Sequence, residues 1–213
     1  MKTLAIFGAG HLGQQIAHYA ITDGHYDKVC YFDDYSIESH IGQYDVLGGQ
    51  NTLIDSFAKG DYDEIIIGIG YKHLKQRKNA YAFVKENKIP LGKLIHSTSW
   101  VDPTAIVEEG SIVYPSCSVD AHAVIRANCV LNIGCVIAHD STIGMHCFLS
   151  PRVAIAGFVR IDERCIIGIN ATIIDNINIC SGVQLGGGAV VIKNIDHTGL
   201  YVGNPSRLVR IFE

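Results

Sequence analysis

Residues 129–149 read CVLNIGCVIAHDSTIGMHCFL, and an aliphatic side chain recurs in this stretch at every sixth position. The same period continues outward on both sides without a gap. The repeat includes fifteen aliphatic residues: Val107, Val113, Val119, Ile125, Leu131, Ile137, Ile143, Leu149, Ile155, Ile161, Ile167, Ile173, Ile179, Leu185 and Val191. Neither the period of a helix nor the alternation of an ordinary strand produces a repeat of six. The repeat therefore indicates a solenoid of equivalent units.

Small residues usually occupy the position two before each aliphatic residue. They are Ala105, Ser111, Cys117, Ala123, Cys129, Cys135, Ser141, Cys147, Cys165, Ala171 and Ala189. Side chains two apart in a strand point to the same side, so one large and one small side chain face inward in each hexad. A narrow triangular interior at ordinary core density holds this combination. Five of the seven cysteines are thereby predicted to be small core residues rather than nucleophiles or metal ligands.

The pattern over residues 103–193 resembles the hexapeptide repeat of left-handed parallel β-helices, in which three hexads form one triangular coil. On this resemblance the fifteen hexads form about five coils, and residues eighteen apart stack on neighbouring coils. Solenoids of this kind commonly carry acyltransferases that assemble as trimers with active sites between subunits. The resemblance therefore implies a homotrimeric acyltransferase.

Residues 1–100 show a different pattern, in which short apolar strands alternate with helices. The expected strands are residues 3–7, 29–32, 65–69 and 94–95. One helix is expected after the first strand, ending at residue 22, and a second over residues 72–87. This alternation predicts a parallel sheet with a ligand crevice at its carboxyl edge. The predicted fold is thus an α/β Rossmann-like domain with a short parallel sheet over residues 1–100. A left-handed β-helix domain with a C-terminal cap follows over residues 101–213.

A glycine-rich motif, Gly8-Ala9-Gly10-His11-Leu12-Gly13, follows the first expected strand. It matches the GxGxxG fingerprint of dinucleotide sites, and the acidic pair Asp33-Asp34 follows about twenty residues later. Glycines allow backbone N–H groups to approach a pyrophosphate at a helix N-terminus. NAD and a nucleotide-diphosphate sugar both carry a pyrophosphate, so an NAD-dependent oxidoreductase and a purely structural turn remain alternatives. The short sheet and the solenoid favour the nucleotide sugar.

Composition excludes several classes of partner. The chain of 213 residues has 17 Lys and Arg against 21 Asp and Glu, a formal net charge of -4. This balance provides no basic surface for a nucleic acid or an anionic membrane. The longest apolar runs are too short to span a bilayer. Seven cysteines without a CxxC motif indicate reduced thiols. We therefore expect a cytoplasmic protein with no nucleic-acid or membrane partner.

A nucleotide-binding domain followed by a left-handed β-helix resembles bacterial sugar acetyltransferases. That family includes the N-acetyltransferases of UDP-linked 4-amino-4,6-dideoxysugars (the bacillosamine pathway) and the sialic acid O-acetyltransferases. The segments that carry the resemblance are Gly8-Ala9-Gly10-His11, Phe32-Asp33-Asp34, Leu131-Asn132, Ala138-His139-Asp140, Ile143-Gly144, Ala156-Gly157, Gly168-Ile169-Asn170, Leu185-Gly186-Gly187-Gly188 and Val202-Gly203-Asn204-Pro205. The resemblance implies acetyl transfer from acetyl-CoA to the amine of a nucleotide-linked sugar. Sugar O-acetylation and a non-catalytic sugar-nucleotide sensor remain alternatives.

The resemblance also implies which residues bind the two substrates. Those expected to bind the nucleotide sugar are Gly8, Gly10, His11, Asp33, Asp34, Lys72 and Asn132. Of these, Lys72 is proposed because it follows an expected strand at the carboxyl edge, where its ammonium can neutralise a phosphate. Those expected to bind coenzyme A are Gly157, Gly168, Gly187, Asn204, Pro205 and Arg207, with Arg210 as an alternative phosphate partner.

His139 is the expected general base. It lies two residues after the inward Ile137, at a coil corner where side chains face outward, and Asp140 beside it can hold the imidazole in one tautomer. A positioned imidazole can take the proton that an amine loses while attacking a thioester. Gly157 lies eighteen residues after His139, so its N–H is expected at the same corner, where it can meet the developing oxyanion. The resemblance assigns the base to the same histidine.

One position departs from the family pattern. Where the family often has a second active-site histidine, nine residues after the base, this chain has Phe148. We expect the acetyl group to be held by Gly157 and apolar contacts. His122 and His146 are expected on the surface, and no metal site is expected, because a zinc site needs converging imidazoles. His122 and His139 are seventeen residues apart, one out of the stacking register.

Overall fold

The computed structural model describes residues 1–212, which divide into two compact units between Leu94 and Ile95. The division falls before residue 100, the boundary expected from the sequence. The strands β6 (Leu94–Ile95) and β7 (Trp100–Val101) already pair with strands of the second unit, which accounts for the earlier division.

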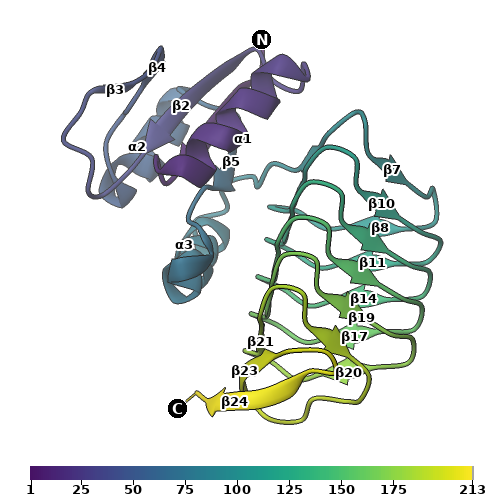
Figure 1. Cartoon of the computed structure of the whole chain (residues 1–213). Helices are drawn as coiled ribbons and strands as arrows, with labels where there is room; N and C mark the ends of the chain where they lie inside the picture. Colours follow the sequence, from purple (N-terminus) through teal and green to yellow (C-terminus); the bar gives the residue numbers. More distant parts are fainter. Residues whose placement is uncertain (213) are drawn as a thin grey trace. The chain divides into compact units, whose positions relative to one another are not determined.

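The first unit is a three-stranded parallel sheet with helices (Figure 1). Its elements are β1 (Thr3–Phe7), α1 (His11–Thr22), β2 (Lys28–Phe32), β3 (His40–Ile41), β4 (Tyr44–Asp45), η1 (Gln50–Thr52), α2 (Leu53–Lys59), β5 (Glu64–Ile67), η2 (Tyr71–His73) and α3 (Leu74–Glu86). The strand order is β2-β1-β5, so β2 and β5 pair with opposite edges of the central strand β1. A crevice forms at such a reversal point, outside the carboxyl ends of the strands.

All the expected elements are present, but one strand joins a different sheet. Strands β1, β2 and β5 and helices α1 and α3 match their predicted positions to within a few residues. The expected fourth strand is β6, but it is an edge strand of the solenoid, where the following His96 N–H donates to the Val113 carbonyl at 2.9 Å. The β3–β4 hairpin and α2 were not predicted.

The second unit is a left-handed parallel β-helix built from three sheets (Figure 1). The β7 face contains β7, β10 (Ser118–Val119), β13 (Val136–Ile137), β16 (Ala154–Ile155), β19 (Thr172–Ile173) and β22 (Val190–Val191). The β8 face contains β8 (Ile106–Val107), β11 (Val124–Ile125), β14 (Thr142–Ile143), β17 (Arg160–Ile161) and β20 (Asn178–Ile179). The β6 face contains β6, β9 (Ile112–Val113), β12 (Val130–Leu131), β15 (Phe148–Leu149), β18 (Ile166–Ile167), β21 (Gln184–Leu185), β23 (Gly199–Val202) and β24 (Arg207–Ile211).

The register of these sheets is the one that the sequence period predicts. Each strand pairs in parallel with the strand eighteen residues further on, as Val119 does with Ile137 and Ile137 with Ile155. All fifteen period-six aliphatic side chains are 7% exposed or less. The five cysteines predicted for the core are buried free thiols. The antiparallel pair β23–β24 closes the C-terminal end of the solenoid.

Each corner between residues 108 and 188 contains one residue in the left-handed backbone conformation. These residues recur every six positions with φ between 54° and 73°: Gly110, Ser116, His122, Asn128, Gly134, Asp140, His146, Arg152, Phe158, Arg164, Asn170, Asn176, Gly182 and Gly188. We name the corners after the face that each follows. The β7 corner contains residues 120–122, 138–140, 156–158 and 174–176. The β8 corner includes residues 126–128 and 144–146, and the β6 corner includes residues 132–134, 168–170 and 186–188.

In the part of the chain that the structure describes, no helix combines the length and the apolar character needed to cross a membrane.

Candidate functional site

A cavity of about 630 Å³ lies at the carboxyl ends of the strands in the first unit. Its lining comes from the segments after β1, β2 and β5 and from α3: Phe7, Gly8, Gly10, Asp33, Asp34, Tyr35, Gln50, Gly68, Ile69, Gly70, His73, Gln76, Asn79 and Ala80. This is where the reversal of strand order predicts a ligand. The lining includes four of the residues predicted to bind the nucleotide sugar: Gly8, Gly10, Asp33 and Asp34.

The glycines of the motif have separate structural tasks. Gly8 has φ +111°, which L side chains rarely adopt. A Cβ on Gly13 would lie 1.9 Å from the Gly8 carbonyl oxygen, so only glycine allows α1 to approach β1 this closely. A Cβ on Gly10 would meet no atom within 4 Å, and Gly10 caps α1, whose first turn has no acidic residue. The N-terminus of α1 therefore offers exposed N–H groups and the positive end of the helix dipole to an anion.

The two aspartates of the predicted pair differ in their contacts. Asp33 accepts hydrogen bonds from the backbone N–H groups of Ala9 at 2.7 Å, Tyr35 at 2.8 Å and Ser36 at 3.0 Å, which engage both carboxylate oxygens. It therefore fixes the two loops that form the cavity wall. Asp34 is exposed and uses Oδ1 to accept from the Gln50 N–H at 2.7 Å.

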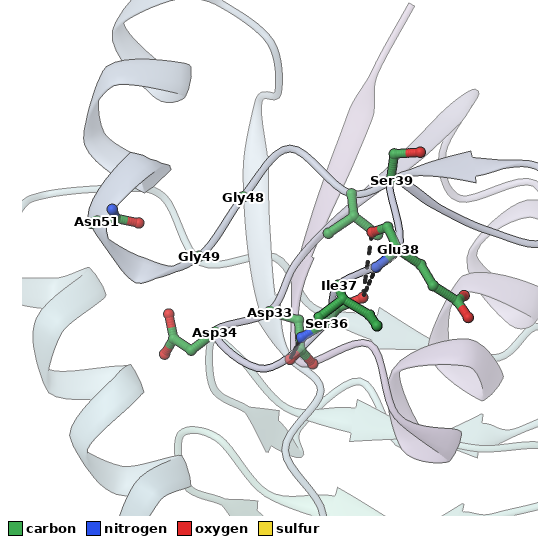
Figure 2. A pocket seen from close by; sticks show the side chains of 10 residues that line it. Asp33, Asp34, Ser36, Ile37, Glu38, Ser39, Gly48, Gly49 and Asn51 are labelled. Carbon is green, nitrogen blue, oxygen red and sulfur yellow. Dashed lines mark hydrogen bonds between the residues drawn. The ribbon is translucent and has the colours of Figure 1, made fainter.

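A second hollow of about 550 Å³ lies beside this pair, between the loop after β2 and residues 46–51 (Figure 2). The Asp34 side chain lies on the side of the loop that carries Gly49 and Asn51, whereas Glu38 extends from the other side. Asp34 thus borders both hollows, because it belongs to the lining of each.

Two residues predicted for this site do not belong to the cavity lining. His11 is exposed at the start of α1, and Lys72 is exposed on η2. The neighbouring His73 lines the cavity instead. The sequence places this turn at the correct edge of the sheet, but the phase of a three-residue 3-10 helix decides which side chain faces inward.

Arg77 is a functional candidate that the sequence analysis missed. It is fully buried on α3 and donates to the carbonyls of Ile67 and Ile69, the latter at 3.0 Å. These bonds hold the segment after β5, which lines the cavity. A signal was available, because Arg77 lies on the same helix face as the buried Ala80 and Val84, where an apolar residue is expected.

In the second unit, His139 lies at the β7 corner with its side chain half exposed. Its Nδ1 is 2.9 Å from Asp140 Oδ2, so Nδ1–H donates to the carboxylate; in a neutral imidazole this leaves Nε2 as the acceptor. Gly157 lies directly beneath the ring: a Cβ built on it would be 2.8 Å from His139 Cε1 and 2.9 Å from Nε2. The imidazole therefore rests on the backbone of the next coil, and any larger residue at position 157 would displace it.

The backbone groups of Gly157 differ in their hydrogen bonding. Its carbonyl accepts from the Asn176 N–H at 3.1 Å, while none of the described residues accepts a hydrogen bond from the Gly157 N–H. That N–H lies beside the imidazole and can donate to a bound oxygen.

Phe158 completes this corner and was also missed by the sequence analysis. Its ring meets the His139 ring edge-on, with centroids 5.1 Å apart and planes at 86°. The signal for it is positional, because a hydrocarbon side chain at a corner position is disfavoured by the left-handed backbone.

The residues predicted to bind coenzyme A, other than Gly157, lie on another part of the solenoid. Gly168 and Gly187, together with Asn132, lie on the β6 corner, at the opposite edge of the β7 face from His139. The turn that contains Asn204 and Pro205 is anchored on β22 of that face, because the Val190 N–H donates to the Gly203 carbonyl at 3.0 Å and the Val190 carbonyl accepts from Ser206. Arg207 is exposed at the start of β24.

The expectation that His146 lies on the surface is wrong. It is 3% exposed on the β8 corner, and its Nδ1 is 3.0 Å from Asn128 Nδ2 one coil earlier. Its left-handed backbone turns the ring onto that asparagine, so strand alternation does not apply. His122 is exposed, as expected. Phe148 is buried in β15 on the β6 face, so within the chain it is not adjacent to the His139 corner.

Residues 3–82 match the family described as the PglD N-terminal domain. The whole chain is similar to the acetyltransferase domain of PglB from Neisseria gonorrhoeae FA1090. The identity is 27%, the TM-score is 0.90, and the match covers 98% of this chain and 100% of that chain. That PglB domain is also known in complex with acetyl coenzyme A. No curated protein matches the chain in sequence.

Two further structures share the fold at lower identity. PerB from Caulobacter crescentus, in complex with CoA and GDP-perosamine, is 23% identical with a TM-score of 0.87, covering 98% of both chains. WeeI from Acinetobacter baumannii AYE is 20% identical with a TM-score of 0.82, covering 98% of this chain and 100% of that one. The predicted resemblance to nucleotide-sugar acetyltransferases is confirmed: residues 3–82 match the PglD N-terminal domain, and the whole chain has the fold of the PglB acetyltransferase domain.

Proposed function

We propose that this protein transfers the acetyl group of acetyl-CoA to the amine of a nucleotide-linked 4-amino-4,6-dideoxysugar, with His139 as general base. The observation that carries the proposal is the stacking of the His139 imidazole on Gly157, with Asp140 on its Nδ1. The 27% identity to a PglB acetyltransferase domain over nearly the whole chain supports the reaction class.

The chemistry proceeds without an acyl-enzyme. The sugar amine attacks the thioester carbonyl, a C–N bond forms, and His139 Nε2 accepts the proton that the nitrogen loses. When the C–S bond breaks, the imidazolium can return that proton to the coenzyme A thiolate. A positioned base of this kind contributes roughly 10²–10⁴-fold to the rate. Asp140 stabilises the imidazolium and keeps Nε2 as the accepting atom.

The developing oxyanion needs a hydrogen-bond donor, and the Gly157 N–H is the candidate. Its carbonyl is engaged with Asn176, whereas its N–H has no acceptor among the described residues. A donor placed at a developing oxyanion lowers the barrier by about 2.7–4 kcal/mol in comparable sites.

The nucleotide diphosphate is assigned to the cavity of the first unit. The pyrophosphate would lie at Gly10 and the N-terminus of α1, where N–H groups and the helix dipole favour an anion. Asp34 is the carboxylate left for the base or the ribose, because both oxygens of Asp33 are engaged with backbone N–H groups. His11 and Lys72 could contribute only from outside the described lining.

Coenzyme A and a trimer are assigned to the solenoid. The outward positions of the β7 face include exposed apolar side chains, with Trp100 at 53% and Val136 at 46%, and Ile174 at 38% and Ile192 at 43% directly follow its last two strands. Such a surface suits a pantetheine arm or neighbouring subunits. Gly168, Gly187, Asn204, Pro205 and Arg207 lie at its edges and end. The free thiols are consistent with work in a reducing cytoplasm.

The proposal is tested by incubating the protein with acetyl-CoA and a panel of UDP-, dTDP- and GDP-linked 3-amino and 4-amino deoxysugars, with thiol release as the readout. Release with a 4-amino sugar, and none with its 4-hydroxy counterpart, is the expected result. Release only with hydroxyl acceptors would establish O-acetylation instead. Thermal stabilisation by NAD alone, with no thiol release from any acceptor, would overturn the proposal.

A further inference from the structure

We infer that Phe158 is a positioning residue that holds the His139 imidazole over Gly157. The inference rests on the proposed role of His139 and adds a residue that neither the sequence motifs nor the resemblance assigns.

The first observation is the backbone conformation of Phe158. Its φ is +58°, in the region where bulky side chains are genuine outliers. Among the left-handed corner residues from 110 to 188, it is the only one with a hydrocarbon side chain. Backbone strain of this kind persists where the surrounding structure imposes it, and it is concentrated at functional sites.

The second observation is that burial does not compensate for this strain. Phe158 is 53% exposed, so half of a large apolar ring faces solvent. Glycine or asparagine would suit the backbone better and would expose less apolar surface. Phe158 is therefore unfavourable both for its backbone conformation and for its exposed apolar surface. We expect its contacts with neighbouring side chains to explain its presence.

The contact in question is with His139. The two rings meet edge-to-face, the arrangement that aromatic pairs prefer, with centroids 5.1 Å apart. The other lateral restraint on the imidazole is its contact with Asp140, whose carboxylate is itself partly exposed. Exposed ion pairs are weak because water and salt compete for them. Asp140, Gly157 and Phe158 therefore confine the imidazole from three directions, and Phe158 supplies the restraint that solvent does not weaken.

The test is F158N in the full-length protein. Asparagine tolerates the left-handed backbone, so the Tm is expected to stay equal or rise. If Phe158 positions the base, kcat falls by about tenfold or more, because a small misplacement of a catalytic group is costly. The KM values for acetyl-CoA and for the sugar should change by less than about twofold, since the residue acts through His139. F158Y keeps the ring and should retain kcat.

R164N is the matched control. Arg164 has φ +59° on the β8 corner and is exposed, and its side chain donates to the neighbouring Glu163 carboxylate at 3.0 Å. The substitution relieves the same kind of strain away from His139, so the Tm should respond as in F158N while kcat stays unchanged. Equal losses of kcat in F158N and R164N would overturn the inference.

Two further outcomes would also overturn it. These are wild-type kcat in F158N, and a raised sugar KM at unchanged kcat, which would make Phe158 a substrate contact. A readout independent of turnover is the crystal structure of F158N. The inference requires His139 to leave its single position over Gly157, and an unmoved ring contradicts it. Activity that survives in H139A would instead refute the proposed base, so the two failures are distinguishable.

Discussion

The carbonyl oxygen of His139 accepts a hydrogen bond from the backbone N–H of Phe158 at 3.2 Å, one coil further along the solenoid. The backbone that carries the proposed base is thus joined directly to the backbone that carries its aromatic neighbour. The distance between the two side chains is set by the ladder of the β-helix rather than by a mobile loop. This rigidity makes the consequences of single substitutions at the corner predictable.

Replacing His139 tests the base. H139A is expected to lower kcat by about 10²-fold or more, because the Asp140 carboxylate that remains at the corner is a much weaker base than an imidazole. The Tm should hold, since the side chain is half exposed and packs on a glycine. H122N is the control, because His122 is an exposed histidine at the same corner one coil earlier. Loss of activity in H122N, or wild-type kcat in H139A, contradicts the assignment.

Replacing Gly157 tests the stacking independently of activity. In G157A the new Cβ would lie 2.8 Å from His139 Cε1, so the ring must move; because the ring is the half-exposed end of a side chain, the protein should lose no more than about 1 kcal/mol of stability. In an H139A background the same substitution should cost almost nothing, because the atoms that it meets are absent. Chemical unfolding of the four proteins measures this coupling. A cost that persists without the imidazole would show that the clash lies elsewhere.

Removing the charge of Asp140 tests the tautomer assignment. D140N keeps a residue that tolerates the φ of +57° at this corner and keeps a hydrogen-bonding side chain. It removes the carboxylate that stabilises an imidazolium, so kcat should fall by about tenfold or more while the Tm changes little. Steady-state kinetics and a thermal melt measure both quantities. A large drop in Tm would indicate a structural role for Asp140 instead.

The solenoid could be predicted from sequence because its signal is redundant. A single aliphatic residue means little, but the period continues unbroken from Val107 to Val191, and it fixes the three faces and the stack of His139 on Gly157 together. The chemistry of the corner followed from the same register. Predicting the solenoid needs little information about distant contacts. Each hexad packs mainly on the hexads that lie three hexads, or eighteen residues, before and after it.

The details that escaped prediction depend on local phase or on tertiary partners. His73 rather than Lys72 lines the cavity because one step of a 3-10 helix decides between them. His146 is buried because a left-handed corner turns it onto Asn128. The two-residue strand at Leu94 has no pattern of its own that says which sheet it joins. The burial of Arg77 could have been suspected from its helix face, but its acceptors are carbonyls, which a sequence does not reveal.

Replacing Arg77 tests whether the nucleotide cavity depends on its buried guanidinium. R77M leaves the carbonyls of Ile67 and Ile69 without these donors and should cost about 1.5–3 kcal/mol of stability per lost charged hydrogen bond. Nucleotide-sugar affinity should weaken, while acetyl-CoA affinity should not change, and calorimetric titration of both ligands measures this difference. K75M, an exposed change on the same helix, is the control. Equal weakening for both ligands would point to global unfolding.

Thiol labelling tests the assignment of the cysteines. Burial raises the pKa of Cys30 to about 12, and burial raises the pKa of Cys147 well above its ordinary value. Only the thiolate reacts, so at pH 8 these groups should be nearly inert in the folded protein and should become more reactive as the pH approaches the raised pKa. The half-buried Cys180 should label first. Ellman's reagent should count seven thiols after unfolding, and fewer would reveal a disulfide.

The unbroken eighteen-residue register has a further consequence for how such a chain can change its length. Deleting one whole coil of eighteen residues leaves every later residue on its original face of the β-helix and shifts it by one coil toward the N-terminal end. Losing six residues between positions 140 and 156 would rotate all that follows by a third of a turn and would bring Glu163 beneath the imidazole in place of Gly157. Unless the extra residues loop out at a corner, insertions and deletions that keep later residues on their original faces therefore come in steps of eighteen residues.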